Sequence, residues 1–144
     1  MVRFIAVEHL LNIRNEVLRN GKFLPDECRF PTDRDIGTFH LGYYFGEDLA
    51  CIGSFHPQNH DQFIGSGYQL RGMAAIERYR DKGTGNRLLN FAIVYLKGQK
   101  INYLWCNARK QALQFYLNVG FEIVSDEFEI KDIGPHFVMY VQIQ

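Results

Sequence analysis

The chain has 144 residues, of which 47% are hydrophobic and 15% are aromatic. This composition suits one domain, residues 1–144, with a packed core, and it excludes an intrinsically disordered protein. Sixteen Lys and Arg residues balance sixteen Asp and Glu residues. The charge therefore gives no reason to expect nucleic acid or an anionic membrane surface as a partner.

The three cysteines, Cys28, Cys51 and Cys106, are odd in number and lack CxxC spacing. They predict buried, reduced thiols rather than a disulfide framework. The apolar run near Met1 is too short for a signal peptide, and no stretch approaches the length of a membrane span. We therefore expect a cytoplasmic protein.

The first half of the chain predicts three strands and one helix. The expected elements are a strand at Val2–Val7, an amphipathic helix at Glu8–Asn20 stopped by Gly21, and a hairpin of Thr38–Phe45 with Leu49–Phe55 around Gly46-Glu47-Asp48. Residues 22–36 contain Pro25 and Pro31 and predict an irregular segment, of the kind that often shapes a substrate site.

The second half predicts alternating strands and helices after a polar connection, residues 56–67. The expected elements are a strand at Tyr68–Ile76 with a bulge or close contact at Gly72, a helix at Gly85–Lys97, a strand at Ile101–Cys106, a helix at Ala108–Val119 capped by Gly120, and two closing strands, Phe121–Ile130 and Phe137–Ile143, around a turn that includes Gly134-Pro135. The predicted fold class is α/β (α+β), a mixed sheet with helices on both faces.

A glycine-containing loop, Arg80-Asp81-Lys82-Gly83-Thr84-Gly85, joins a predicted strand to a predicted helix. Two glycines let the backbone turn tightly and point successive N–H groups inward, and the helix N-terminus adds its positive end. The loop therefore predicts an anion site, with Arg80, Lys82 and Arg87 at its rim. A plain turn with surface Arg and Lys is the alternative.

Two better-known phosphate loops do not fit these residues. A P-loop has four residues between its glycines and then Gly-Lys-Ser/Thr, whereas only Thr84 separates the glycines here and Asn86 follows. The dinucleotide fingerprint has a third glycine where Leu88 stands.

Two motifs resemble the GNAT superfamily of acyl-CoA-dependent N-acetyltransferases. Arg80-Asp-Lys-Gly83-Thr-Gly85 is similar to that family's Gln/Arg-x-x-Gly-x-Gly/Ala loop. Ala112-Leu-Gln-Phe115-Tyr116-Leu-Asn-Val-Gly120-Phe121 is similar to its Ala-x-x-Leu/Phe-Tyr-x-x-x-Gly-Phe. The motifs stand in the family's order, with one predicted helix and one strand between them. The resemblance implies a mixed, mostly antiparallel sheet of about six to seven strands.

The resemblance also implies roles for particular residues. Arg80, Asp81, Lys82, Gly83, Thr84 and Gly85 are expected to bind the pyrophosphate of coenzyme A, and the backbone of Met73, Ala74 and Ala75 is expected to pair with its pantetheine arm. Tyr116 matches the tyrosine that lies near the coenzyme sulfur and protonates the leaving thiolate, because a phenol within hydrogen-bond reach can act as a general acid. A core tyrosine is the alternative.

Some positions depart from the family pattern. Arg109 stands where many relatives have a coenzyme-binding Asn, and Asn107 lies two positions earlier, so either could make that contact. Gln69 stands where some branches place a Glu general base, and an amide cannot act as a base. The sequence therefore leaves the base unidentified.

The flanks resemble an ElaA-like branch most closely. The matching residues are Arg14-Asn-Glu-Val17, Asp33, Asp35, His40 and Gly134-Pro135-His136. His136 is the candidate for contacting or deprotonating the amine, because imidazole titrates near neutral pH, and a structural histidine is its alternative.

The expected function is transfer of an acetyl group from acetyl-CoA directly to a primary amine of a small-molecule or peptide acceptor. A catalytically silent acyl-CoA sensor or interaction module is the alternative, and a nucleotide-binding protein is a third possibility. We expect no metal site: His56 and His60 have HxxxH spacing, but Pro57 argues against a helix there. Family habit suggests a homodimer through the C-terminal strands.

Overall fold

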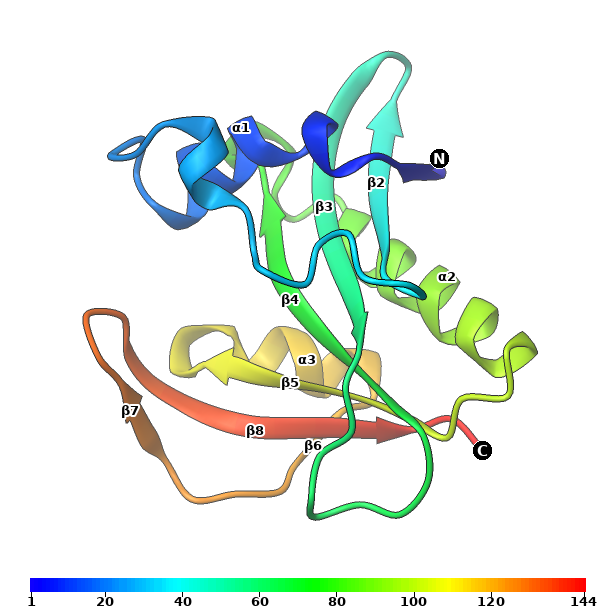
Figure 1. Ribbon diagram of the computed structural model, residues 1–144. Helices are drawn as coiled ribbons and strands as arrows, with labels where there is room; N and C mark the ends of the chain where they lie inside the picture. Colours follow the sequence, from blue (N-terminus) through cyan, green and yellow to red (C-terminus); the bar gives the residue numbers. More distant parts are fainter.

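The computed structural model describes residues 1–144 as one eight-stranded sheet with helices on both faces (Figure 1). The strand order is β1-β2-β3-β4-β5-β8-β6, and β7 also pairs with β8. The strands are β1 (Val2–Ile5), β2 (Phe39–Phe45), β3 (Asp48–Pro57), β4 (Gly67–Ala75), β5 (Tyr103–Arg109), β6 (Glu122–Ile123), β7 (Phe128–Ile130) and β8 (Gly134–Gln142). The predicted mixed, mostly antiparallel fold is confirmed, with one strand more than expected.

Strands β1 to β4 form an antiparallel half-sheet in chain order. The predicted hairpin is confirmed: Phe45 pairs with Asp48 across a two-residue turn, in which Gly46 has φ +59°. The bulge expected in β4 is also present, because the β3–β4 register shifts between Ile52 and Ser54, opposite Gly72 with φ +65°.

The single parallel pair, β4 with β5, holds together over only three residue pairs, from Gly67↔Tyr103 to Gln69↔Trp105. Beyond that point β4 continues to Ala75 and β5 to Arg109, and the two strands diverge (Figure 1). The edge of β4 from Leu70 to Ala75 consequently has no strand partner on its β5 side. This split in the sheet positions the site described below.

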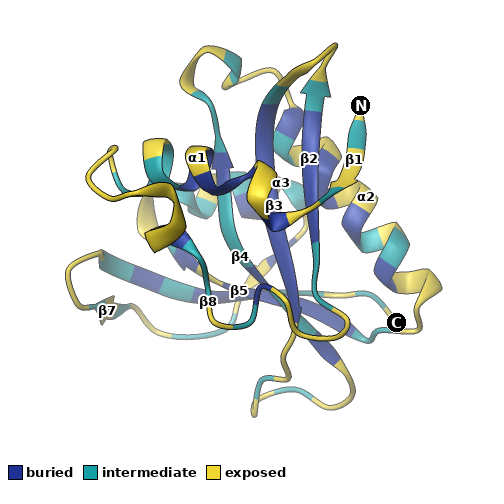
Figure 2. Cartoon of the chain, turned by 45° about the horizontal axis from the view of Figure 1, so that its top comes forward, coloured by how far each residue is buried: buried dark blue, intermediate teal, exposed yellow.

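Two layers of helix cover the sheet. Helices α2 (Thr84–Gly98) and α3 (Leu113–Val119) bury one face, in a cluster that includes Leu88, Leu96 and Tyr116. The helical stretch η1 (Val7–His9), α1 (Leu11–Ile13), η2 (Arg14–Leu18) and η3 (Pro25–Cys28) covers the other face over β3 and β4. Figure 2 shows the buried residues along the central strands and exposed ones in most loops.

A third cluster closes the face of β5 and β8 that points away from α3. Tyr103, Trp105 and Val138 are its buried members. The 58–66 connection packs against them, with the Trp105 indole N–H donating to the Gln58 carbonyl at 2.8 Å.

Several predicted boundaries are wrong. The helix expected at Glu8–Asn20 is split into a 3₁₀ turn, a short α-helix and a π-helical turn. The π-helical turn begins at Arg14, whose side chain is buried and donates hydrogen bonds to Asp33. Strand β3 runs through His56 to Pro57, so His56 is not in the connecting loop. Strand β5 runs to Arg109, and helix α3 begins only at Leu113, after a 3₁₀ turn (η5, Lys110–Ala112). Glu77–Tyr79 forms a further 3₁₀ turn, η4.

The C-terminal strands also differ from expectation. The strand expected at Phe121–Ile130 is two strands, because Ser125 Oγ takes the place of a backbone acceptor for the Val138 N–H at 2.8 Å. The turn lies at residues 131–133, closed by the Ile133 N–H to the Ile130 carbonyl. Gly134-Pro135 belongs to β8, where Pro135 lies one residue beyond the β5 pairing and its missing N–H breaks no ladder bond to β5.

No helix is both long and apolar enough to cross a membrane.

Candidate active site

A cleft of about 1190 Å³ opens where β4 and β5 separate. Its walls include most residues that the sequence predicted for the site, namely Met73, Ala74, Ala75, Arg80, Asp81, Gly83, Thr84, Gly85, Asn107, Arg109, Tyr116 and His136. Lys82 and Arg87, which were expected at the rim, are not part of the wall: Lys82 is exposed, and Arg87 Nη1 donates to the Tyr43 hydroxyl at 3.1 Å. A smaller hollow of about 410 Å³ between Asp26 and Arg34 contains none of them. The structure thus brings together residues from β4, the glycine loop, β5, α3 and β8.

The glycine loop follows the 3₁₀ turn η4 and begins α2 with a left-handed turn. Asp81 has φ +63° and Gly83 has φ +75°, and Gly83 is the N-cap residue of the helix. The first backbone hydrogen bond of α2 runs from the Arg87 N–H to the Gly83 carbonyl. The N–H groups of the residues between them donate to no protein group, and no acidic side chain caps the turn. The helix end is therefore open to an anion.

Gly85 has a different purpose from Gly83. A Cβ at Gly85 would lie 2.9 Å from two ring atoms of Phe115 and 3.2 Å from the Met73 methyl group, whereas a Cβ at Gly83 would meet nothing. Gly85 thus lets the start of α2 pack against α3 and β4, while Gly83 supplies the left-handed backbone. The two helix ends are held in contact at the cleft.

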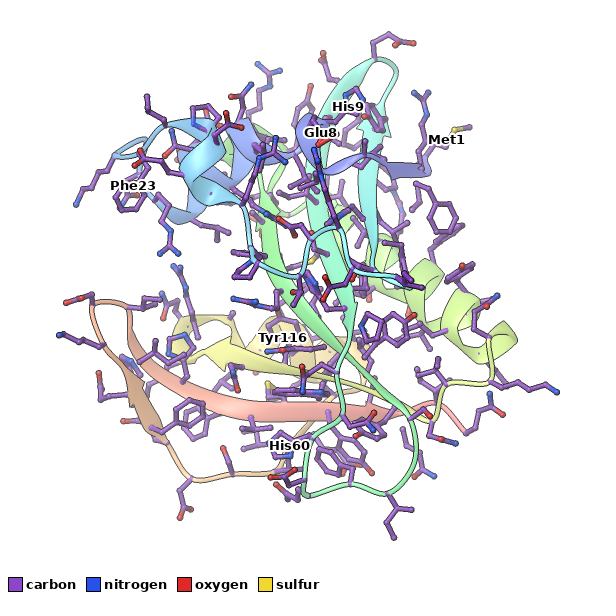
Figure 3. All side chains as sticks on the ribbon, viewed as in Figure 1. Met1, Glu8, His9, Phe23, His60 and Tyr116 are labelled. Carbon is purple, nitrogen blue, oxygen red and sulfur yellow. The ribbon has the colours of Figure 1, made fainter.

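Tyr116 lies on α3 in the interior of the molecule (Figure 3). Its side chain is buried beside Cys106 and packs in edge contact with Phe115. Burial, with the Cys106 thiol as its next cause, raises the pKa of the Tyr116 phenol well above its ordinary value. Tyr116 therefore stays protonated near neutral pH and is available as a proton donor.

Two cysteines, Cys51 and Cys106, also line the cleft. Burial raises the pKa of the Cys51 thiol to about 11 and that of the Cys106 thiol further still. All three cysteines are buried and free, as predicted. Because the thiolate is the nucleophilic form, these protonated thiols are poor candidates for a covalent acyl carrier.

His136 lies in β8 directly opposite Arg109 of β5, on the face of the sheet that points away from α3. Its side chain is buried, and Nδ1 lies 2.7 Å from the Gly134 carbonyl oxygen. A carbonyl only accepts, so Nδ1 carries the proton and Nε2 of the neutral ring is left with its lone pair. His136 can thus accept a proton from a group in the cleft.

The two positions at which this chain departs from the family pattern, Arg109 and Gln69, both line the cleft. Asn107 and Arg109 are two residues apart on β5, so their side chains lie on the same face of the sheet as His136. Gln69 is also part of the wall, at the last residue pair that joins β4 to β5. No carboxylate stands near that split, in agreement with the absence of a Glu at this position in the sequence.

A buried ionic network that the sequence reasoning did not find closes the α1 end of the cleft. Arg14 binds Asp33 through two bonds, Nη1–Oδ2 at 2.7 Å and Nη2–Oδ1 at 2.9 Å, and also donates to the Cys28 carbonyl and Ser54 Oγ. Despite burial, the hydrogen bonds from Arg14 keep the pKa of Asp33 below its ordinary value. Arg14 lies in an otherwise apolar helix face, which is the signal that could have revealed it.

His40 continues this network through a fixed set of donors. Ser54 Oγ accepts from Arg14, so its O–H donates to His40 Nδ1 at 2.7 Å, and His40 Nε2 donates to the Asp33 carbonyl at 3.0 Å. Burial lowers the pKa of His40. The imidazole is therefore a neutral structural link and is not free to accept a substrate proton.

His56 and His60, which have HxxxH spacing, lie in different parts of the structure and make different contacts. His56 is buried in β3, where Nδ1 lies 2.9 Å from Thr32 Oγ1, and burial lowers its pKa to about 4. His60 lies in the 58–66 connection (Figure 3). Its ring contacts the Trp105 ring edge-on. The two side chains thus serve separate packing contacts.

The chain is similar to known acetyltransferases over most of its length. The model of the acetyltransferase (GNAT) domain matches residues 41–141. The uncharacterized N-acetyltransferase YitI of Bacillus subtilis (strain 168) is 36% identical over 140 residues, which cover 96% of this chain and 93% of YitI. This chain belongs to the GNAT acetyltransferase family.

Solved structures of the same fold agree with the family assignment. An aminoglycoside 6'-N-acetyltransferase complexed with coenzyme A has a TM-score of 0.73 at 13% identity, covering 100% of this chain and 97% of that one. FeeM, an N-acyl amino acid synthase from uncultured soil microbes, has a TM-score of 0.80 at 13% identity, covering 99% and 90%. At 13% identity these neighbours show the fold alone. The split between β4 and β5 is observed directly in the strand pairing of this chain.

Proposed function

We propose that this GNAT-family acetyltransferase moves an acetyl group from acetyl-CoA directly to a primary amine. The observation that carries the proposal is the cleft at the β4–β5 split, which connects the open N-terminus of α2 with Tyr116 on one face of the sheet and His136 on the other. Two substrates can therefore meet through the sheet. The neighbour solved with coenzyme A supports this choice of acyl donor.

The residues of the cleft fit coenzyme A. The free N–H groups of Thr84, Gly85 and Asn86 would hold the pyrophosphate, with Arg80 at the rim. The unpaired edge of β4 would offer backbone groups to the pantetheine arm, and the small side chains of Ala74 and Ala75 leave room beside it. When bound, the coenzyme supplies the acetyl group as a thioester.

Asn107 and Arg109 lie on the His136 face of β5, so they would contact the coenzyme where its arm passes through the split between β4 and β5. The cleft volume of about 1190 Å³ exceeds the roughly 300–1,000 Å³ of a typical small-molecule site, which agrees with a site for two substrates.

Tyr116 and His136 would divide the proton transfers. Tyr116 donates its phenolic proton to the sulfur that leaves as the amine nitrogen bonds to the acetyl carbon, and His136 Nε2 accepts the proton that the amine loses. The products are an amide and a free thiol. The proton on His136 then returns through solvent to the tyrosine, which restores both groups. High thiol pKa values at Cys51 and Cys106 favour this direct route over a cysteine-bound acyl group.

A weak base suffices because the cleft itself favours the neutral amine. Its wall contains five arginines, of which only Arg14 is paired with an acidic side chain, Asp33, and one carboxylate, that of Asp81 in the glycine loop. Nearby positive charge disfavours an ammonium ion and lowers its pKa, so a larger fraction of a bound amine is in the nucleophilic form.

Titration calorimetry with acetyl-CoA tests the proposal, with ATP and NAD as controls. Selective micromolar binding, about 8 kcal/mol, is expected for acetyl-CoA. Thiol release with a panel of primary amines is the second step. Selective binding without thiol release from any amine would instead favour the catalytically silent acyl-CoA module, and preference for ATP or NAD would favour a nucleotide-binding protein.

The finer expectations drawn from the sequence stay predictions. These are the ElaA-like branch, a homodimer through the C-terminal strands and a cytoplasmic location, the last of which agrees with three free, buried thiols.

A further inference from the structure

Arg71 lines the cleft without an ionic partner, as Arg109 does on the β5 wall. It lies in β4 opposite Ser54, so its side chain projects on the face of the sheet that α1 covers. Its guanidinium carbon stands 4.3 Å from the centre of the Phe30 ring. The side chain is half-buried and lines the cleft, yet no carboxylate pairs with it and no acceptor receives its N–H groups.

The Asp33 carboxylate, whose charge acts on Arg71, is already engaged by other groups. Asp33 accepts both Arg14 bonds and a third from the Phe30 N–H at 2.7 Å. Arg14 stacks on the same Phe30 ring at 3.9 Å, and its buried Nε has no hydrogen-bond partner. Burial, and next the charge of Arg14, lowers the pKa of Arg71. A half-buried arginine held in this way is costly unless an anion completes it.

Phe30 and Gly72 hold Arg71 in place. A Cβ at Gly72 would lie 3.1 Å from the Phe30 ring and 3.3 Å from Arg14 Nε, so only glycine lets the ring pack against the β4 bulge. The planar guanidinium resting on this ring is oriented before any ligand arrives, which favours the two-point binding that arginine gives to carboxylates.

The phosphates of a coenzyme do not explain this arginine. Arg71 precedes the bulge, whereas the glycine loop lies beyond the other end of β4. Four residue steps, about 13 Å of strand, separate Arg71 from Ala75 even before the loop begins. Arg71 shares the face of the sheet on which His136 lies, which is the acceptor side in the proposed function.

The absence of acidic side chains at this end of the cleft bears on the acceptor too. The only carboxylate in the wall is Asp81, in the glycine loop, while Arg19 and Arg71 stand at the α1 end without a carboxylate partner and Arg14 is paired with Asp33 behind the wall. An acceptor that carries several ammonium groups would meet repulsion there and no counter-ion.

From this geometry we propose that the acceptor is an amine that also carries a carboxylate, and that Arg71 binds the carboxylate while the amine faces His136. The proposal rests on the proposed acetyl transfer and names its acceptor class. The transfer balances as before: the amine nitrogen gains the acetyl carbon and loses one proton, the coenzyme leaves as the thiol, and the carboxylate is unchanged in the N-acetylated product.

Thiol release from acetyl-CoA is the first measurement, using glycine, longer ω-amino carboxylates up to 6-aminohexanoate, leucine and phenylalanine. Each is paired with its carboxamide, and spermidine and an aminoglycoside serve as polycationic comparators. We expect at least one amino carboxylate to be used with a kcat/KM at least about tenfold above that of its amide, because a planar ion pair is lost in the amide.

Arg71→Gln should remove this preference through KM for the carboxylate, and Arg71→Lys should restore part of it, while the amides react as with the unaltered protein. Arg78→Gln is the matched control, since Arg78 is an exposed arginine outside the cleft wall. A preference for amides or polycations, or a carboxylate preference that survives Arg71→Gln, would overturn the proposal.

Calorimetry on the protein saturated with coenzyme A separates this proposal from the proposed function. Tighter binding of the amino carboxylates than of their amides, lost in Arg71→Gln, supports the acceptor class even if no thiol is released, in which case acetyl transfer is wrong. Amide acetylation without any carboxylate preference in transfer or binding leaves acetyl transfer standing and removes the role of Arg71.

Discussion

Arg14 and Asp33, nineteen residues apart in the chain, form a buried two-point ion pair at 2.7 and 2.9 Å. The pair ties the π-helical turn η2 to the irregular segment before β2 and lies behind the Phe30 ring that supports Arg71. The α1 end of the cleft is thus built on an electrostatic contact rather than on apolar packing alone.

Arg14→Met should strongly destabilise the fold. It leaves Asp33 buried without its charge partner, and breaking a buried pair on one side typically costs about 3–5 kcal/mol. Urea unfolding at pH 7 measures the loss. Arg29→Met, which removes a surface pair with Glu8, is the control and should leave the unfolding free energy nearly unchanged. Equal losses in the two variants would show that the buried pair has no special weight.

Stability should fall as the pH drops from 7 to 5, partly through His56. Its pKa is about 4 in the folded protein and 6.5 ordinarily, so between these values the unfolded chain binds more protons and acid favours unfolding. The His56 share is about 2 kcal/mol over this interval. His40, whose pKa is also lowered, acts in the same direction.

Unfolding of His56→Gln, followed at both pH values, isolates this contribution. The variant should lose less stability on acidification than the unaltered protein does. An identical loss in the two proteins would mean that His56 protonates as easily in the folded state as in the unfolded one.

Gly85→Ala should destabilise the start of α2 by about 1–3 kcal/mol, because its Cβ would lie 2.9 Å from the Phe115 ring. Phe115→Leu removes the two ring atoms in question, so the double variant should recover part of the loss. A double-mutant cycle in urea measures the coupling. Strictly additive losses would show that the ring yields without cost and that Gly85 is not needed for close packing.

Tyr116→Phe should lower kcat about a hundredfold while the Kd for acetyl-CoA stays the same, since only the proton donor is removed. Tyr79→Phe removes a hydroxyl that donates to Asp48 outside the cleft and serves as the control. Steady-state thiol release and calorimetry give the two quantities. An unaltered kcat in Tyr116→Phe would leave the tyrosine with a packing role.

Local sequence signals predicted the parts of the fold that local chemistry decides. The period of Leu88, Leu89, Ala92 and Leu96 marks α2, and Gly83 is required where φ is positive. The resemblance to the GNAT motifs, rather than these local signals, predicted that the glycine loop and the Tyr116 motif share one site, and the roles of their residues stay predictions.

The sequence did not predict the contacts between residues that are distant in the chain. The length of the β4–β5 pairing is set by twist and by what packs on each strand, so three residue pairs before the split could not be read from either strand alone. Arg14, Asp33 and Phe30 meet only after folding, and the side chain of Ser125 rather than a turn motif ends the strand after α3.

Hydrogen–deuterium exchange with and without acetyl-CoA tests the central claim most directly, because the N–H groups of residues 84–86 and the β5-facing edge of β4 have no partner in the protein. Bound acetyl-CoA should slow exchange in 83–86 and in 70–75, and leave the 58–66 connection unchanged. Exchange that is unaltered in both segments, or slowed only elsewhere, would contradict a coenzyme site at the split of the sheet.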